Sequence, residues 1–171
     1  MTTKKYMTLS VVILAIFALV ASASAVVSVG SKASDFQLTS VDGKSAIKLS
    51  SYFGKPMLLV YWASWCPHCR TEVPVVQKIY NDLHSAGLEI VGVSFDRSAK
   101  DARDFMKSKS VTFPVAFGGT DQGMKVADIY GVSGIPVTFV LDKNAVVKTV
   151  FRGDPGEKAI RAELTKLGLS K

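Results

Sequence analysis

Cys66-Pro67-His68-Cys69 follows, two residues on, an apolar run that reads Met57-Leu58-Leu59-Val60-Tyr61-Trp62-Ala63. A continuous apolar run of this length predicts a buried β-strand. Pro67 suits the first position of a helix, because that position has no backbone N–H obligation. The sequence therefore predicts a strand, a short loop and a helix, with Cys66 at the helix N-terminus and Cys69 one turn further on.

These two cysteines are the only ones among the 171 residues. The free N–H groups and the positive dipole end at a helix N-terminus favour a thiolate there. Cys69 is near enough to resolve a mixed disulfide formed at Cys66. The pair therefore predicts a reversible dithiol/disulfide couple, with a Cys66–Cys69 disulfide in its oxidised form.

Two other roles for the pair are weaker. A structural zinc ion needs about four ligands, and beyond the cysteines the chain offers only His68 and His84. His68 lies between the cysteines with poor chelate geometry, so we expect no metal. A static disulfide is also disfavoured, because a bridge closing so short a loop restricts the unfolded chain little.

The N-terminus predicts export. Lys4 and Lys5 precede an uncharged apolar core, Val11–Ala21, and Ala23-Ser24-Ala25 offers small residues for signal-peptide cleavage. The uncharged stretch extends from Tyr6 to Ser31 and is long enough for an uncleaved anchor. Residues 1–25 are therefore expected to be a signal peptide, cleaved after Ala25, or an N-terminal membrane anchor.

In both cases the remaining chain is expected outside the cytoplasm, in the periplasm or at the outer face of the cytoplasmic membrane. Cysteine pairs oxidise and persist in such compartments. The exported part is long enough for one compact domain with a hydrophobic core. The chain has 21 basic and 14 acidic residues and a net charge of +7. No arginine-rich stripe or basic run with interleaved aromatics predicts a nucleic-acid partner.

Periodicity and turn residues predict the order of elements. Strands are expected at 36–39 and 46–49, joined by Asp42-Gly43-Lys44, then a helical turn at 50–53 and the strand at 57–63. A helix from Pro67 to Gly87, a strand at 88–95, a helix at 99–109 and a short strand or extended segment within 111–117 follow. The C-terminal part predicts a helix at 124–130, a hairpin of 138–141 and 146–152, and a helix at 157–167. This α/β alternation predicts a parallel sheet covered by helices, with the late hairpin as an antiparallel edge.

The segment from Trp62 to Cys69 resembles the active-site segment of the thioredoxin superfamily. Further segments resemble the TlpA/ResA-like branch of exported thiol–disulfide oxidoreductases: Ala33-Ser34-Asp35-Phe36 with Asp42-Gly43-Lys44, Arg70-Thr71-Glu72-Val73-Pro74, and Tyr130-Gly131-Val132-Ser133-Gly134-Ile135-Pro136-Val137-Thr138-Phe139 followed by Asp142-Lys143. The resemblance implies a thioredoxin-like domain at 33–168. Its fold would be a central mixed sheet flanked by helices, with an extra N-terminal β-hairpin.

The resemblance also implies a substrate-binding surface beside the cysteines. Pro136 is expected to form a cis peptide and to face Cys66 and Cys69. The Ile135 backbone would then pair with an incoming peptide as an added strand. Trp65, next to Cys66, belongs to the same surface. From the sequence alone, Pro136 equally fits an ordinary loop proline before a strand.

Two residues depart from the patterns of related proteins. Thioredoxins carry a buried acid at the position of Val60, whereas here Glu72 lies one turn beyond Cys69 on the same helix face. The resemblance implies that Glu72 handles protons for the dithiol; spacing alone leaves a solvated helix glutamate open. The second departure is His68: the Pro67-His68 dipeptide between the cysteines resembles that of the strongly oxidising DsbA type. An imidazole at this position can stabilise the Cys66 thiolate, and so the reduced form, which raises the reduction potential.

The expected function is an exported thiol–disulfide oxidoreductase with catalytic residues Cys66, Cys69, Glu72 and His68. It needs no cofactor, because the electrons reside in the dithiol. Its partners would be protein disulfides or dithiols and a membrane redox protein that recycles it; one candidate process is cytochrome c maturation. The reductase direction is expected, with a DsbA-like oxidase as the alternative.

Two other functional classes remain as alternatives. One is a peroxiredoxin-like thiol peroxidase, although Ala63 and Leu59 replace the threonine and proline of that family's loop. The other is a copper-handling module, since two cysteines suit Cu(I). Only His84 could add a distant ligand, and it lies in the wrong region of the helix.

Overall fold

The computed structural model describes residues 26–170, which form a central five-stranded sheet in the order β5-β4-β3-β6-β7. Its strands are β3 Met57–Trp62, β4 Glu89–Ser94, β5 Val115–Phe117, β6 Val137–Leu141 and β7 Val147–Arg152. Strands β3, β4 and β5 are parallel to one another, whereas β6 is antiparallel to β3 and β7. The sheet is therefore mixed, with the late hairpin forming its antiparallel side, as the sequence predicts.

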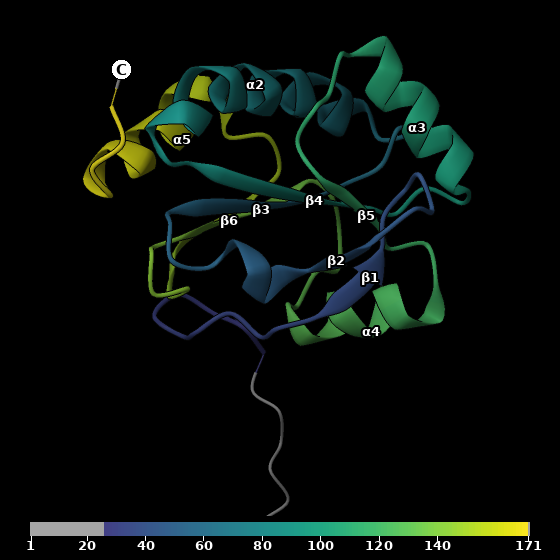
Figure 1. The fold of residues 1–171 in the computed structure, drawn as a ribbon, viewed down its shortest axis with the longest axis horizontal. Helices are drawn as coiled ribbons and strands as arrows, with labels where there is room; N and C mark the ends of the chain where they lie inside the picture. The colour runs from purple at the N-terminus through teal and green to yellow at the C-terminus, as the bar shows by residue number, and fades with distance from the viewer. Residues whose placement is uncertain (1–25, 171) are drawn as a thin grey trace, which may run out of the picture.

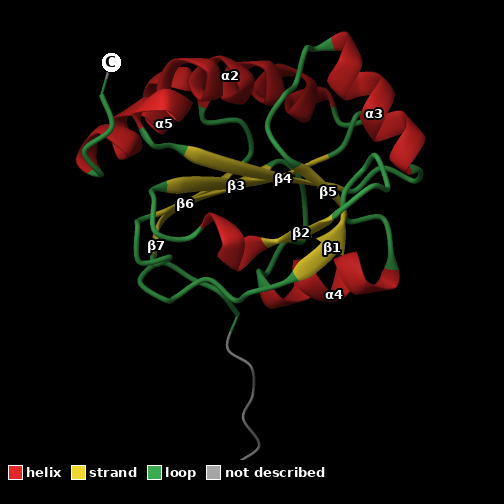
Figure 2. Ribbon diagram, in the orientation of Figure 1, coloured by secondary structure: helices red, strands yellow, loops and turns green. Residues whose placement is uncertain are grey.

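Helices cover both faces of this sheet (Figure 1). They are α2 Pro67–Leu83, α3 Ala99–Ser108, α4 Asp121–Ile129 and α5 Gly156–Lys166. Figure 1 shows α2, α3 and α5 on one face and α4 on the other. The N-terminal strands β1 Gln37–Thr39 and β2 Ala46–Lys48 form a separate antiparallel sheet on the α4 side (Figure 2). The expected extra hairpin is confirmed, and the 3₁₀ turn η1 Leu49–Tyr52 follows it.

The first turn of α4 differs from the sequence-based expectation. The helix begins at Asp121, three residues before the expected start, and the Thr120 hydroxyl caps it by accepting from the Gly123 N–H at 3.1 Å. Gly123 obscures this start, because glycine is a poor helix former. A side chain at Gly123 would collide with the Gly118 carbonyl, so close packing explains the glycine.

The first long helix ends in two stages. Helix α2 ends at Leu83, and the 3₁₀ turn η2 His84–Ala86 continues the path to Gly87. Gly87 has a φ of 104°, a left-handed conformation that glycine adopts without a steric penalty. The helical path ends at Gly87 as expected, but the α-helix itself ends four residues earlier, at Leu83.

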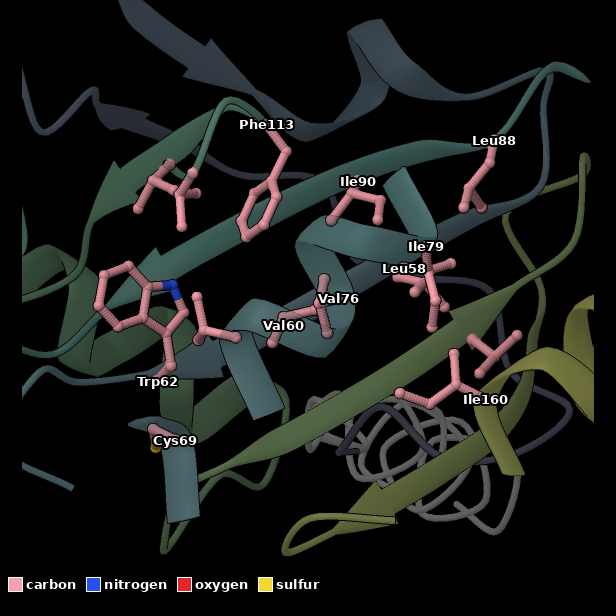
Figure 3. Close-up of a cluster of buried hydrophobic side chains, with 14 of the residues drawn as sticks. Leu58, Val60, Trp62, Cys69, Val76, Ile79, Leu88, Ile90, Phe113 and Ile160 are labelled. Atoms are coloured by element: carbon pink, nitrogen blue, oxygen red, sulfur yellow. The ribbon is translucent and has the colours of Figure 1, made fainter. Parts of the chain in front are cut away.

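Every residue of β3 is buried, which explains its unbroken apolar sequence. Leu58, Val60 and Trp62 pack on the face covered by α2, together with Val76 and Ile79 (Figure 3). The alternate residues of β3 join a second cluster on the α4 face. Burying a large aliphatic side chain of this kind contributes roughly 1.5–3 kcal/mol. The central strand is thus fixed from both sides, and it sets the point at which the following loop begins.

The expected signal peptide or anchor at residues 1–25 lies outside the described residues. Among the helices of residues 26–170, none is long and apolar enough to cross a membrane.

Candidate active site

The two cysteines stand where strand β3 passes into helix α2. Cys66 is the N-cap residue of α2 in an extended conformation, and Pro67 is the first helical residue. The Cys66 N–H donates to the Ala63 carbonyl at 3.2 Å and closes the loop between strand and helix. The predicted placement of Cys66 at a helix N-terminus is confirmed.

The two thiols differ in their surroundings. Both cysteines are free thiols; Cys66 keeps a 5% exposed fraction, whereas Cys69 is fully buried. Cys69 belongs to the hydrophobic cluster under α2 (Figure 3). Burial raises the pKa of the Cys69 thiol far above its ordinary value, and a hydrogen bond with Cys66 raises the pKa further. Of the pair, Cys66 alone has exposed surface, and its sulfur is the outer one.

A distant loop meets the outer sulfur. The Ile135–Pro136 peptide is cis, as the family resemblance implies. The Cys66 thiol donates to the Ile135 carbonyl oxygen, with 3.5 Å between sulfur and oxygen. The sheet makes this contact possible, because β6, which follows Pro136 directly, pairs with β3. The structure thus brings Ile135 and Pro136 to Cys66.

Glu72 is fully buried beneath the dithiol, so the alternative of a solvated helix glutamate is wrong. Its Oε1 accepts a hydrogen bond from the Thr138 hydroxyl at 2.7 Å, while Oε2 has no hydrogen-bond partner among the described residues. Burial raises the pKa of Glu72 to about 7, and the charge of Asp154 adds to the rise, although the Thr138 bond opposes it. A carboxyl with this pKa can gain or lose a proton near neutral pH.

Two other expected site residues are at the surface. His68 is exposed, and its ring makes no hydrogen bond to either sulfur within the described residues. Trp65 is 61% exposed although it is a large apolar side chain. Exposed tryptophans beside a reactive group are typical of binding surfaces.

Two hollows include residues that neighbour or contact Cys66. One, of about 660 Å³, is lined by Ser64, Trp65, Phe95, Asp96, Arg97 and Asp101. A smaller one, of about 230 Å³, is lined by Ser133, Gly134, Ile135, Pro136, Val137, Arg152 and Gly153. The first contains Trp65, the residue before Cys66, and the second contains Ile135, whose carbonyl Cys66 contacts.

Two polar residues at this site carry no clear signal in the sequence. Thr138 lies in a segment that resembles the family, but its contact with Glu72 requires the β3–β6 pairing. Asp96 is buried at the end of β4 and bonds to Ser64 in the loop before Cys66. The sequence offers one weak signal for Asp96, which is that an acid follows closely after the buried strand β4. That strand is parallel to β3 and pairs with it. Within residues 26–170, no group of three or more histidine, cysteine or acidic residues is arranged to hold a metal ion.

The mixed sheet, the dithiol at a helix N-terminus and the cis-proline loop define a thioredoxin-like protein of the thiol–disulfide exchange class. The model of the AhpC/TSA family matches residues 29–150. Thiol-disulfide oxidoreductase ResA of Geobacillus thermodenitrificans (strain NG80-2) is 33% identical, over 82% of this chain and 79% of that protein.

Solved structures agree with this match. A thiol:disulfide interchange protein, thioredoxin family protein from Chlorobium tepidum TLS, superposes with a TM-score of 0.72 at 26% identity, covering 82% of this chain and 97% of that chain. A DsbF homologue from Corynebacterium diphtheriae has a TM-score of 0.71 at 27% identity, covering 80% and 87%. The chain belongs to the AhpC/TSA family of thioredoxin-like proteins, on its ResA-like branch of thiol–disulfide oxidoreductases. The resemblance seen in the sequence is confirmed.

Proposed function

We propose that this enzyme works outside the cytoplasm and reduces disulfides in exported proteins, with Cys66 as nucleophile and Cys69 as resolving thiol. The observation that carries the roles of the two thiols is the asymmetry of the pair. Cys66 is the N-cap residue of α2 and reaches the cis-proline loop, while Cys69 is fully buried one turn further along the helix.

The reaction follows from this asymmetry. The Cys66 thiolate attacks one sulfur of a substrate disulfide, forming a mixed disulfide and releasing the other substrate sulfur as a thiolate. The Cys69 thiolate then attacks the Cys66 sulfur, and the second substrate sulfur leaves. Two electrons pass from the dithiol to the substrate, and the enzyme ends with a Cys66–Cys69 disulfide. No cofactor enters these steps.

Glu72 supplies proton transfer for the second step. Cys69 must lose its proton to attack, yet burial raises its pKa far above neutrality. The Glu72 carboxylate lies close enough for its charge to raise that pKa, and its unpartnered Oε2 has no competing donor among the described residues. With a pKa of about 7, Glu72 accepts a proton from Cys69 near neutral pH.

Substrate recognition uses the surface around Cys66. A peptide strand lies along Ile135 and Pro136, with main-chain hydrogen bonds providing affinity. Trp65, the residue before Cys66, provides an exposed apolar contact. This arrangement favours a protein disulfide over a small one, and an apocytochrome c with oxidised haem-attaching cysteines is one candidate substrate.

Export and direction rest on the sequence. The basic start and apolar stretch of residues 1–25 support export by a signal peptide or anchor. The ResA-like branch supports reduction, and a membrane redox protein would then return electrons to the dithiol. His68 favours the oxidising direction, so the alternative is a DsbA-like oxidase.

The redox state of the pair in cells tests the direction. Rapid acid quenching followed by thiol alkylation counts free Cys66 and Cys69 in an exported fraction and in a cytoplasmic one. The proposal predicts a reduced pair in the exported fraction. A pair that is oxidised there at steady state would assign the oxidase role, and protein found only in the cytoplasmic fraction would refute export.

The match to the AhpC/TSA family model favours one second function, peroxide reduction. The threonine and proline of the peroxiredoxin active-site loop are absent, because Ala63 and Leu59 occupy their positions. We therefore expect turnover of hydrogen peroxide to be slow beside turnover of a peptide disulfide. The opposite ratio in a direct comparison would assign the peroxidase function.

A further inference from the structure

Asp96 is a buried acid that the exchange mechanism above does not use. It has a 1% exposed fraction and lies two residues beyond the end of β4. Its carboxylate accepts from three donors: the Ser64 N–H at 3.0 Å, the Ser64 hydroxyl at 2.6 Å and the Ser94 hydroxyl at 2.8 Å. Burying a carboxylate is costly unless such bonds compensate for the lost water.

These bonds hold the loop that carries the nucleophile. Ser64 is two residues before Cys66, between the end of β3 and the start of α2. The loop also has the Cys66 N–H bond to the Ala63 carbonyl at 3.2 Å and a long contact of 3.5 Å from the Arg70 guanidinium to the Ser64 carbonyl. Both of these join the loop to itself or to α2. The bonds that Asp96 accepts from Ser64, at 3.0 and 2.6 Å, are shorter, and they tie the loop to the end of the neighbouring strand β4.

The hydrophobic core holds the two ends of this loop, Ala63 and Cys66, but not its middle. Trp65 lies between Ser64 and Cys66, yet it is 61% exposed and gains little from packing. Ser64 is half-buried and carries no apolar group that could anchor it. By contrast, the neighbouring backbone is packed tightly on Asp96, because a side chain at Gly119 would collide with the Asp96 carbonyl. The rigid partner is thus Asp96, and the loop is held to it.

We propose that Asp96 is a positioning residue for disulfide exchange. By fixing Ser64, it keeps Trp65 at the substrate-facing surface and the Cys66 sulfur beside the Ile135 carbonyl. Exchange requires three sulfur atoms nearly in line, so small errors in the position of an attacking atom slow the reaction strongly. The inference rests on the proposed role of Cys66 as nucleophile and is independent of the direction of electron flow.

The test separates positioning from simple stabilisation by using two reactions of the same sulfur. One is exchange with a disulfide-bonded peptide, which requires alignment. The other is alkylation by iodoacetamide, which is small and approaches from any open side. In Asp96→Asn we expect exchange to slow about tenfold, with alkylation changed by less than about threefold. Ser64→Ala, which removes only the hydroxyl bond, should slow exchange by a smaller factor.

The matched control is Asp104→Asn. It removes an exposed carboxylate of α3 that accepts a hydrogen bond from Lys100 on the same helix. Its rates should equal those of the wild type. Wild-type exchange rates in a folded Asp96→Asn variant, or an equal fall in both reactions, would overturn the proposal. If Asp96→Asn does not fold, wild-type exchange in both Ser64→Ala and Ser64→Gly would overturn it equally. A wild-type protein that fails to exchange with the peptide would instead refute the role of Cys66.

Discussion

Replacing Glu72 by glutamine should remove a pH-dependent loss of stability from the reduced enzyme. The carboxyl is fully buried, and burial moves its pKa from 4.5 to about 7. Each pKa unit of difference between the unfolded and the folded state corresponds to about 1.4 kcal/mol. Keeping Glu72 ionised in the folded protein therefore costs about 3 kcal/mol. Glutamine has nearly the same shape and never ionises.

The sign of the effect is set by proton binding. Below about pH 4.5, Glu72 is protonated in both the folded and the unfolded chain, and the cost is absent. Between about pH 4.5 and 7 the unfolded chain loses this proton while the folded protein keeps it, so the free energy of unfolding falls as pH rises. Above about pH 7 the full cost is present. The wild type should therefore lose about 3 kcal/mol relative to Glu72→Gln across this range.

Urea unfolding of both proteins, kept reduced and measured from about pH 4 to pH 8, gives this difference directly. The buried amide of the variant adds a cost that does not change with pH. Glu163→Gln is the matched control: the pKa of Glu163 is lowered by hydrogen bonds from Lys166 and Thr149, so its pH trend should have the opposite sign. Parallel stability curves for wild type and Glu72→Gln would refute the reasoning.

Three other outcomes follow from the site. Thr138→Val removes the hydroxyl that lowers the pKa of Glu72, so the step that Glu72 produces in the pH–rate profile of exchange should move to higher pH; an unmoved step would separate Glu72 from the reaction. Iodoacetamide at neutral pH should modify Cys66 at least about tenfold faster than Cys69, because burial covers Cys69 and raises its pKa; mass spectrometry of the peptides measures the ratio, and equal modification would contradict the asymmetry. The wild-type reduction potential should lie between about −270 and −120 mV, and His68→Pro should lower it by tens of millivolts, where about 30 mV corresponds to ~1.4 kcal/mol; equal potentials in a glutathione titration would show that His68 does not tune the couple.

Local chemistry made much of the fold predictable. The apolar run of β3, the proline at the start of α2 and the glycine at 87 each encode a short segment through its own sequence. The first turn of α4 was not predictable in this way, because Gly123 is there to let the helix pack against Gly118. That requirement comes from tertiary structure and leaves no helical signal in the sequence.

In the candidate site, too, the features set by local sequence were predictable, and those set by tertiary structure were not. Cys66 and Cys69 are three positions apart, and helix geometry alone places them one turn from each other. The contact between Cys66 and Ile135, by contrast, joins residues 69 positions apart, and only the family resemblance anticipated it. Asp96 and Thr138 act through strand pairing across the sheet, so their partners became visible only in the folded structure.

The order in which the two sulfurs react is the central claim, and trapping mixed disulfides with a disulfide-bonded substrate tests it most directly. In Cys69→Ser, Cys66 can still attack but nothing resolves the product, so a covalent complex should accumulate and disappear on reduction. In Cys66→Ser, the remaining thiol is fully buried, and no complex should form. Trapping by Cys66→Ser alone would reverse the two roles and contradict the account.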